Sequence, residues 1–321
     1  MFERVLGRST RNRMSTASNS QVLPSYSSRA ATASKFALGI AILLVISGCI
    51  HLSLYLIVGT TWHGPLSLRK PILFGISGGM TAFSIAWLMT HLRPQRADRL
   101  VVNSVAFTLL IEVALITMQY WRGVASHFNH STRFDESLEF TMIGLILYVT
   151  GVIIYLALRT IRLRELEPSM AFAIRAGMAL LALSCGLGIA TTALGEASLS
   201  AGKSPEFFGK ADVLKFPHGA ALHAIQLLPL VAWLGTRLDV KSSLPAVQAA
   251  FASQVLFLIY AVWQTSQGRD RFDWDVIGGS ILGASILAGL FTAAELGRAY
   301  VRCFSRNIRL TSASDRGSES D

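Results

Sequence analysis

The stretch LVVNSVAFTLLIEVALITMQYWRGVASHFNHSTRFD, residues 100–135, decides the fold because it joins a long apolar run directly to a polar one. Residues 100–121 are apolar over about 20 positions, the length that crosses roughly 30 Å of hydrocarbon at about 1.5 Å per residue. Residues 122–135 then bring several charged and polar side chains together. This change is typical of a transmembrane helix that ends in a loop at the membrane surface.

The composition of the whole chain indicates the same class of protein. Of the 321 residues, 52% are hydrophobic and only 15% are charged, and the mean hydropathy is +0.48. A soluble domain of this size does not carry so much apolar surface. We therefore expect an all-α polytopic transmembrane helix bundle that has the lipid bilayer as its surroundings.

Apolar runs of similar length recur along the chain, and they predict eight spans, with seven as the main alternative. The runs lie near 36–58, 71–92, 100–121, 139–160, 169–194, 217–236, 244–265 and 276–301. The sixth run begins with Pro217 and His218 and also carries His223 and Gln226. Its first part is therefore expected to be irregular or lined by water.

The two ends of the chain differ in composition from the apolar region between them. Residues 1–34 are rich in Ser, Thr, Ala and Arg and lack an apolar period, so a disordered cytoplasmic leader is predicted there. Residues 35–303 are predicted to form the transmembrane domain and residues 304–321 a disordered cytoplasmic tail. A mitochondrial transit peptide has a composition similar to that of the leader, and Met14 is an alternative start.

The distribution of Lys and Arg predicts the orientation. Nineteen of the 29 Lys and Arg residues fall on the side of the N-terminus, nine fall on the other side, and Arg175 lies inside the fifth run. Because cytoplasmic loops are enriched in these residues, both termini are predicted to be cytoplasmic. The same bias accounts for the net charge of +10 without a nucleic-acid partner, since no nucleic-acid-binding motif accompanies it.

Four landmarks occur in the same order in both halves of the chain, which predicts two tandem four-helix repeats over about residues 35–165 and 166–303. An even number of spans in each repeat relates the two by an axis along the membrane normal. The paired landmarks are Ser47-Gly48-Cys49 with Ser184-Cys185-Gly186, Lys70-Pro71 with Lys215-Phe216-Pro217, Trp121 with Trp263, and Arg133-Phe134-Asp135 with Arg271-Phe272-Asp273.

Polar residues near the extracytoplasmic ends of the spans are the candidate ligand site. Glu112, Gln119 and Arg122 form a stripe on the third span, and ionisable groups in a membrane usually face the bundle interior. The alternative is a buried hydrogen-bond network that only fixes helix packing, in which Glu112 bonds a polar group on another span or stays protonated. The candidate residues are Lys70, Glu112, Gln119, Arg122, His127, Asn129, Asp135, His218 and His223.

Two contacts are predicted for this cluster. Arg122 is expected to engage Asp135, Asp273 or a neighbouring loop carbonyl. His127 and Asn129 are expected to fold over the helix ends and contact the sixth span near His218.

The histidines allow two kinds of cofactor site, and the sequence leaves the cofactor open. A metal-dependent hydrolase needs three protein ligands and an open water position, for which His127, His218 and His223 are weak candidates. A bis-histidine haem requires two histidines at one depth, and His51 with His218 or His223 is the available pairing. The seven histidines of the chain do not form the HxxHH boxes of a membrane desaturase.

The strings RGVASHFNHSTRFD, TWHGPLSLRKPILFGIS and KFPHGAALHAIQLLP resemble a group of uncharacterised bacterial multi-pass membrane proteins. That group carries an RGxxSHFN-type segment and a tryptophan followed by a Lys-Pro at the head of a helix. The resemblance covers the second to fourth spans best and the sixth loosely. It implies a bacterial membrane protein and no chemical activity. We therefore expect the bacterial inner membrane, with the mitochondrial inner membrane as the alternative because of the composition of the leader.

Three functions remain open from the sequence. The first is transport or lipid handling, in which an outward-facing polar pocket binds a small molecule or a lipid headgroup. Arg122, Lys70 and Lys215 suit an anionic group of such a ligand. The second is an intramembrane haem- or metal-dependent enzyme, and the third is a ligand-free structural or assembly subunit.

Overall fold

The computed structural model describes residues 26–317 except residues 63, 164–165, 206, 209, 213 and 239–242. Within this part of the chain, eight helical segments are long and apolar enough to cross a membrane. They are Lys35–Val58, Arg69–Met89, Asp98–Trp121, Arg133–Thr160, Pro168–Ser200, Lys215–Arg237, Leu244–Ser266 and Val276–Ser305. The prediction of an all-α polytopic transmembrane bundle with eight spans is confirmed.

Among the described residues, the regular secondary structure is helical apart from a short hairpin between the fifth and sixth spans, in which β1 and β2 pair antiparallel. The elements are α1 (Tyr26–Val58), α2 (Arg69–Met89), α3 (Asp98–Trp121), α4 (Arg133–Thr160), α5 (Pro168–Ser200), β1 (Phe207–Phe208), β2 (Ala211–Asp212), α6 (Lys215–Leu222), α7 (Ala224–Arg237), α8 (Leu244–Ser266) and α9 (Val276–Gly317). Helix α1 begins inside the segment predicted as a leader, and residues 1–25 lie outside the described residues. Helix α9 continues past the predicted domain end at residue 303.

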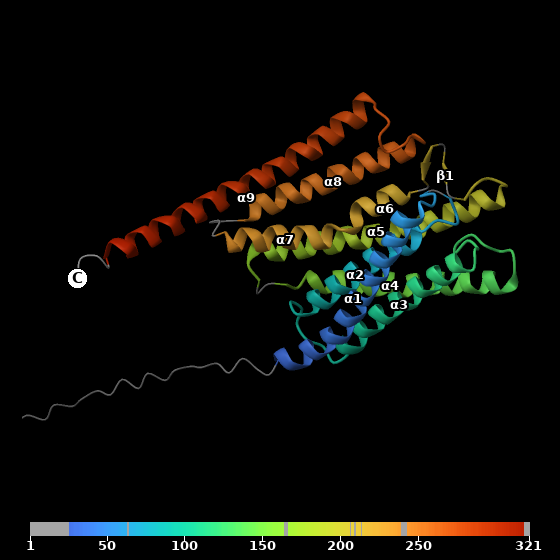
Figure 1. The fold of residues 1–321 in the computed structure, drawn as a ribbon, viewed down its shortest axis with the longest axis horizontal. Coiled ribbons are helices and arrows are strands. Elements are labelled where there is room, and N and C mark those ends of the chain that lie inside the picture. The colour runs from blue at the N-terminus through green and yellow to red at the C-terminus, as the bar shows by residue number, and fades with distance from the viewer. Residues whose placement is uncertain are drawn as a thin grey trace, which may run out of the picture.

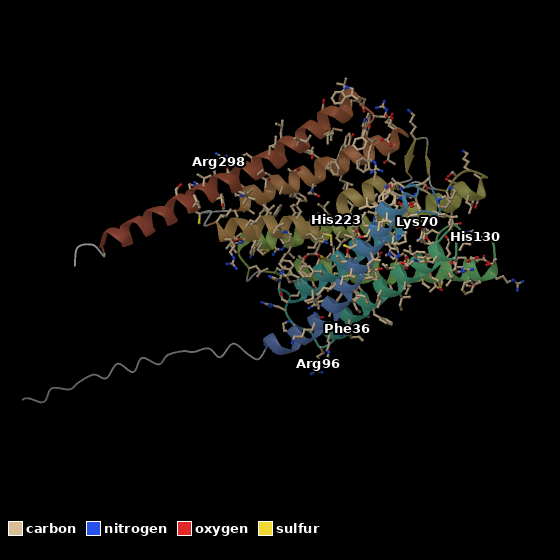
Figure 2. All side chains as sticks on the ribbon, in the orientation of Figure 1. Phe36, Lys70, Arg96, His130, His223 and Arg298 are labelled. Atoms are coloured by element: carbon tan, nitrogen blue, oxygen red, sulfur yellow. The ribbon has the colours of Figure 1, made fainter. Side chains whose placement is uncertain are left out.

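The spans lie side by side, with α9 next to α8 at one edge of the bundle and α3 and α4 toward the other (Figure 1). The loops at residues 59–68, 122–132, 201–214 and 267–275 connect the spans at one end, which we call the His130 end. The loops at residues 90–97, 161–167 and 238–243 connect them at the opposite end, which we call the Arg175 end. His130 and Arg96 accordingly lie far apart along the bundle (Figure 2).

Helices α1 and α2 pack backbone against backbone because glycines line their contact. A Cβ atom on Gly79 would lie 2.6 Å from the carbonyl oxygen of Ala41, and one on Gly75 would lie 2.9 Å from the Cα of Gly48. Small residues spaced four apart allow this close approach in membranes, where lipid removes the usual hydrophobic driving force between helices. In the second half, a Cβ on Gly177 of α5 would lie 2.8 Å from the Cα of Ile225 on α7.

Each half of the chain packs its spans in the same order. In the first half, α1 contacts α2 and α3, α2 contacts α3, and α3 contacts α4. In the second half, α5 contacts α6, α7 and α8, the pair α6 and α7 contacts α8, and α8 contacts α9. This correspondence is what a tandem repeat predicts, and superposing the two halves is the test of that prediction.

Helix α5 belongs to the apolar cores of both halves. Ile174 and Met178 lie in the core of the first half, whereas Ala173 and Leu180 lie in the core of the second. Helix α4 packs against α5, and α2 touches α7. The two halves therefore form one bundle that is joined through α5.

The sixth span is broken at His223, which separates α6 from α7. The expected irregularity of this span therefore occurs within it. Gln226, one turn beyond the break, donates from Nε2 to Ser84 Oγ of α2 at 2.9 Å. His223 Nε2 lies 3.5 Å from Ser77 Oγ on the same helix, so polar side chains join the two halves at this depth.

Candidate functional site

The loop at residues 122–132 is fixed at both ends by hydrogen bonds to α4. Thr132 caps the helix in an extended conformation, and its Oγ1 accepts the backbone N–H of Asp135 at 3.1 Å. The Thr132 hydroxyl in turn donates to Asp135 Oδ2 at 2.7 Å. This N-terminal cap starts α4 at Arg133, before the apolar run that begins near residue 139.

Arg122, Gln119 and Asp135 form a polar brace between α3 and α4, in which Gln119 and Asp135 are buried and Arg122 is exposed. Arg122 Nη1 donates to Asp135 Oδ1 at 2.7 Å, which confirms the predicted pairing. Gln119 donates from Nε2 to the same oxygen at 3.0 Å and accepts from Arg122 through Oε1. Gln119 and Asp135 are almost completely buried, so the hydrogen bonds within the brace take the place of those that their polar atoms would make to water.

The second half has a similar brace at the same end. Gln264, fully buried near the end of α8, donates from Nε2 to the carbonyl oxygen of Asp273 at 2.5 Å. Arg269 Nη1 lies 2.6 Å from Asp275 Oδ2, and Asp275 Oδ1 accepts the backbone N–H of Gly278 at 3.0 Å. In each half, a buried glutamine thus lies near the end of the third span, and an Arg–Asp pair lies close to it. This similarity favours a structural role for both braces.

Glu139 is a buried carboxylate of α4. The corresponding helix of the second half, α9, has no acidic residue before Glu295 among its described residues. Its Oε1 accepts the backbone N–H of Phe128 at 2.6 Å, and its Oε2 accepts that of Asn129 at 2.9 Å. The side-chain amide of Asn129 bonds within its own loop, to the Ala125 carbonyl at 3.0 Å and to the Ser131 hydroxyl at 2.6 Å.

The same loop reaches across to α5 of the second half. The Phe128 ring lies so close to Gly195 that an added Cβ would clash with ring carbon Cζ. His130 Nε2 lies 3.4 and 3.3 Å from the two carboxylate oxygens of Glu196 and 3.8 Å from Glu139 Oε2. His130, Glu139 and Glu196 therefore form one cluster at the His130 end.

The sequence pattern did not single out these three residues. His130 lies in the recognised polar segment, but Glu139 and Glu196 lie at the edges of apolar runs. Their meeting depends on the loop crossing from α4 to α5. The available signal was that both glutamates interrupt or adjoin otherwise apolar helices, where an acidic group needs a partner.

A small cavity lies at this end, and of the predicted ligand-site residues its lining contains Lys70. Lys70, Ser67, Tyr120 and Ser126 line a cavity of no more than about 160 Å³ together with apolar neighbours. Ligand pockets occupy roughly 300–1,000 Å³. His127 lies beside this region, where its Nδ1 is 2.9 Å from Ser126 Oγ and its ring lies 6.0 Å from that of Phe74 on α2.

The other candidate histidines are held by polar groups of the bundle. His218 Nδ1 lies 2.8 Å from the Ser184 carbonyl oxygen of α5. His51 Nδ1 lies 2.7 Å from the Ser47 carbonyl oxygen, and His51 Nε2 accepts from Trp121 Nε1 at 3.4 Å. With both ring nitrogens of His51 engaged, an axial role toward haem iron requires its hydrogen bonds to rearrange.

Two expectations remain untested by these contacts. The predicted contact of His127 and Asn129 with the sixth span near His218 stays a prediction. Glu112, near the middle of α3, is only 4% exposed, and its Oε2 accepts no hydrogen bond within the described part of the chain. Whether it is protonated stays a prediction as well.

A second candidate site lies at the Arg175 end, between α4 and α5. A cavity of about 500 Å³ opens there, and its lining is apolar except for Thr160 and Arg175. Leu158 and Ile161 at its edge are more than half exposed, so the cavity faces the lipid side of the bundle. The lining residues are Ile154, Ala157, Leu158, Thr160, Ile161, Arg175, Ala179 and Ala182.

Arg175 caps the C-terminal end of α4, which borders this cavity. It donates from Nε to the carbonyl oxygen of Thr160 at 3.2 Å and from Nη2 to that of Leu163. It lies seven residues into α5, about 10 Å from the helix start. The sequence signal for this site was Arg175 itself, a basic residue inside the fifth apolar run.

No family model, no curated protein and no solved structure matches this chain. The geometry of the two sites is therefore the ground for a functional assignment.

Proposed function

We propose that this protein handles lipid, and that it binds an anionic phospholipid in the cavity between α4 and α5. The observation that carries the proposal is a cavity of about 500 Å³ that is apolar, faces lipid and contains one arginine at the junction of the two halves. An apolar pocket of this size with a few convergent polar groups is the usual form of a ligand site. Basic pockets between transmembrane helices bind anionic lipid headgroups.

The charge distribution supports placing this cavity in the cytoplasmic leaflet. Arg93, Arg96 and Arg99 flank one loop of the Arg175 end, and Arg159 and Arg162 flank the next. The positive-inside rule puts such loops in the cytoplasm, and with them both chain termini. We assign the protein to the bacterial inner membrane on this orientation together with the resemblance of its RGxxSHFN segment.

The specificity of the proposed site comes from the headgroup. An acyl chain gains little by leaving other lipid for an apolar cavity, because lipid tails are as apolar as the lining side chains. A phosphate gains a charge-assisted hydrogen bond to a guanidinium, which is planar and presents five N–H donors. Hydrogen bonds to the carbonyl oxygens of Thr160, the last residue of α4, and of Leu163 in the following loop hold the Arg175 guanidinium beside the cavity, so its orientation is set before a lipid arrives.

Native mass spectrometry with phosphatidylglycerol and phosphatidylethanolamine tests this proposal. We expect wild-type protein to retain phosphatidylglycerol preferentially, and Arg175→Ala to lower that preference about tenfold, the equivalent of about 1.4 kcal/mol. Arg298→Ala is the matched control, because Arg298 is exposed on α9 and pairs with Glu295. Equal retention by wild type and Arg175→Ala contradicts the proposal.

A second variant separates lost binding from a damaged helix end. Arg175→Lys keeps the positive charge but loses the guanidinium hydrogen bonds to two carbonyl oxygens. Ala182→Trp, by contrast, fills the cavity and leaves Arg175 in place. If the site binds lipid, Ala182→Trp lowers retention and Arg175→Lys keeps part of it. Unchanged retention in Ala182→Trp shows that lipid binds elsewhere.

A further inference from the structure

We propose that His130, Glu139 and Glu196 bind one divalent transition-metal ion of the zinc class at the His130 end. The proposal is independent of lipid binding, because this cluster and the α4–α5 cavity lie at opposite ends of the bundle. It rests on a different set of residues from the histidines expected from sequence. The ion would join the α3–α4 loop of the first half to α5 of the second.

The distances between the three side chains suit a small cation. One ligand atom from each residue lies within 4.8 Å of the others. His130 Nε2 is 3.3 Å from Glu196 Oε2 and 3.8 Å from Glu139 Oε2. Zinc bonds of about 2.0–2.1 Å in a tetrahedral site place neighbouring ligand atoms roughly 3.3–3.5 Å apart. The distances of His130 to the two glutamates are close to this spacing, and the two carboxylates, which lie within 4.8 Å, would approach each other around the ion.

Glu139 has the hydrogen bonds of an oriented metal ligand. Each of its oxygens accepts one backbone N–H, from Phe128 or from Asn129. A carboxylate oxygen has two lone pairs, so one on each oxygen remains for a cation. Ligating carboxylates in metal sites are oriented by outer partners of this kind, which fix the side chain before the metal arrives.

The charge of the cluster also calls for a cation. Glu139 is 1% exposed, and Glu196 brings a second carboxylate to the same imidazole. Two carboxylates around one histidine leave negative charge next to a nearly dry group, which is unfavourable unless it is compensated. A divalent ion compensates both carboxylates and accepts a neutral imidazole nitrogen.

The ligand types favour a zinc-class ion over calcium or magnesium. Calcium and magnesium prefer six or more oxygen ligands, whereas imidazole nitrogen suits zinc and its neighbours. The side chains of His130 and Glu196 are 35% and 36% exposed, so solvent reaches the cluster. A water molecule therefore has access to a fourth coordination position.

The comparison of the two halves isolates this cluster from the structural braces. Both halves carry the buried glutamine and the Arg–Asp pair. The loop at residues 267–275 has no histidine, and the first turns of α9 have no acidic residue. Stabilising the loop therefore does not require a His–Glu–Glu cluster, which makes a function specific to the first half the better account.

Zinc titration of the purified full-length protein tests the site. After chelation and removal of the chelator, we expect one Zn²⁺ per chain by elemental analysis and competition with a chromophoric indicator. Glu196→Gln is expected to lower the affinity by about 10- to 100-fold, and His130→Ala similarly. Glu136→Gln is the matched control, since Glu136 is an exposed carboxylate of the same helix outside the cluster.

Cobalt gives a second readout that does not depend on stability. Bound Co²⁺ should show the intense visible bands of a four-coordinate site in wild type and Glu136→Gln, and lose them in His130→Ala. Zinc affinity that is equal in wild type and Glu196→Gln overturns the proposal. The proposal is also overturned if wild-type protein binds no more metal than the Glu196→Gln variant does. In that case His130 only forms an ion pair with the two glutamates.

Discussion

Arg122 compensates Asp135, whose carboxylate the bundle has almost completely removed from water. Arg122→Ala should lower the free energy of unfolding by about 1–3 kcal/mol, because the buried carboxylate loses a charged donor. Thermal or denaturant unfolding in detergent measures the change. Arg133→Ala is the control, since Arg133 is exposed at the start of α4. Equal stability of the two variants contradicts a structural brace.

Asp275 in the second brace should make stability depend on acid. The backbone N–H of Gly278 lowers its pKa most, and Trp263 Nε1–H and Arg269 lower it further, while burial opposes them. A carboxyl whose folded pKa is depressed stabilises the protein above its unfolded pKa of about 3.9, and this contribution is lost as the pH falls through the folded value.

Asp275→Asn should therefore flatten the acid side of the curve of melting temperature against pH, from about pH 5 down through the depressed folded pKa of Asp275. Arg269→Ala should flatten it in part, because Gly278 and Trp263 still bond the carboxylate. An unchanged acid slope in Asp275→Asn counts against this assignment.

At the scale of residues, the sequence predicted which groups need partners better than which partners they find. Arg122 at the end of an apolar run had to pair, and Asp135 was within reach along the chain. Glu139 and Glu196 were not predictable as partners of His130. Their meeting depends on a left-handed Phe128 at φ 58° and on Gly195, which gives its ring space on α5.

The contact between α1 and α2 depends on glycines rather than on apolar bulk. Gly79→Val should separate the helices and destabilise the bundle by about 1–3 kcal/mol, because the new side chain meets the backbone of α1. Gly144→Val on α4 is the control, since a Cβ there meets nothing within 4 Å. Melting temperatures of the purified variants compare them, and a Gly79→Val protein as stable as Gly144→Val contradicts this packing.

At the scale of elements, the number and type of helices were predictable because bilayer thickness fixes the length of an apolar run. Helix ends were less so: α4 begins early because Thr132 and Asp135 cap it, and a cap outweighs hydropathy at a membrane edge. The position of the break at His223 was also missed. Pro217 and His218 indicated irregularity at the start of the span, whereas the helix breaks further along it.

The bundle as a whole has a basic Arg175 end and a His130 end that carries the acidic cluster. Reporter fusions at Arg96 and Arg162 should therefore be cytoplasmic, and fusions at Ser131 and Lys203 extracytoplasmic. Alkaline phosphatase and green fluorescent protein distinguish the two locations. The reverse pattern would move the lipid cavity to the other leaflet and the metal cluster to the cytoplasm.

At this scale the sequence predicted the class of molecule and missed the cavity. Hydropathy reports that an arginine in the fifth run is unusual, but a cavity depends on how α4 and α5 pack. No local pattern encodes the space between Ala179, Ala182 and Leu158. The predicted repeat indicated a junction between the two halves, but it did not indicate at which end of this junction a cavity lies.

An electron cryomicroscopy map of the protein in nanodiscs that contain phosphatidylglycerol tests the lipid assignment most directly. We predict density for a phosphate within hydrogen-bond distance of Arg175 and for an acyl chain against Leu158 and Ala182, both lost in Arg175→Ala. A wild-type map in which side chains close this cavity, or in which no headgroup density adjoins Arg175, would contradict lipid binding at the junction of the two halves.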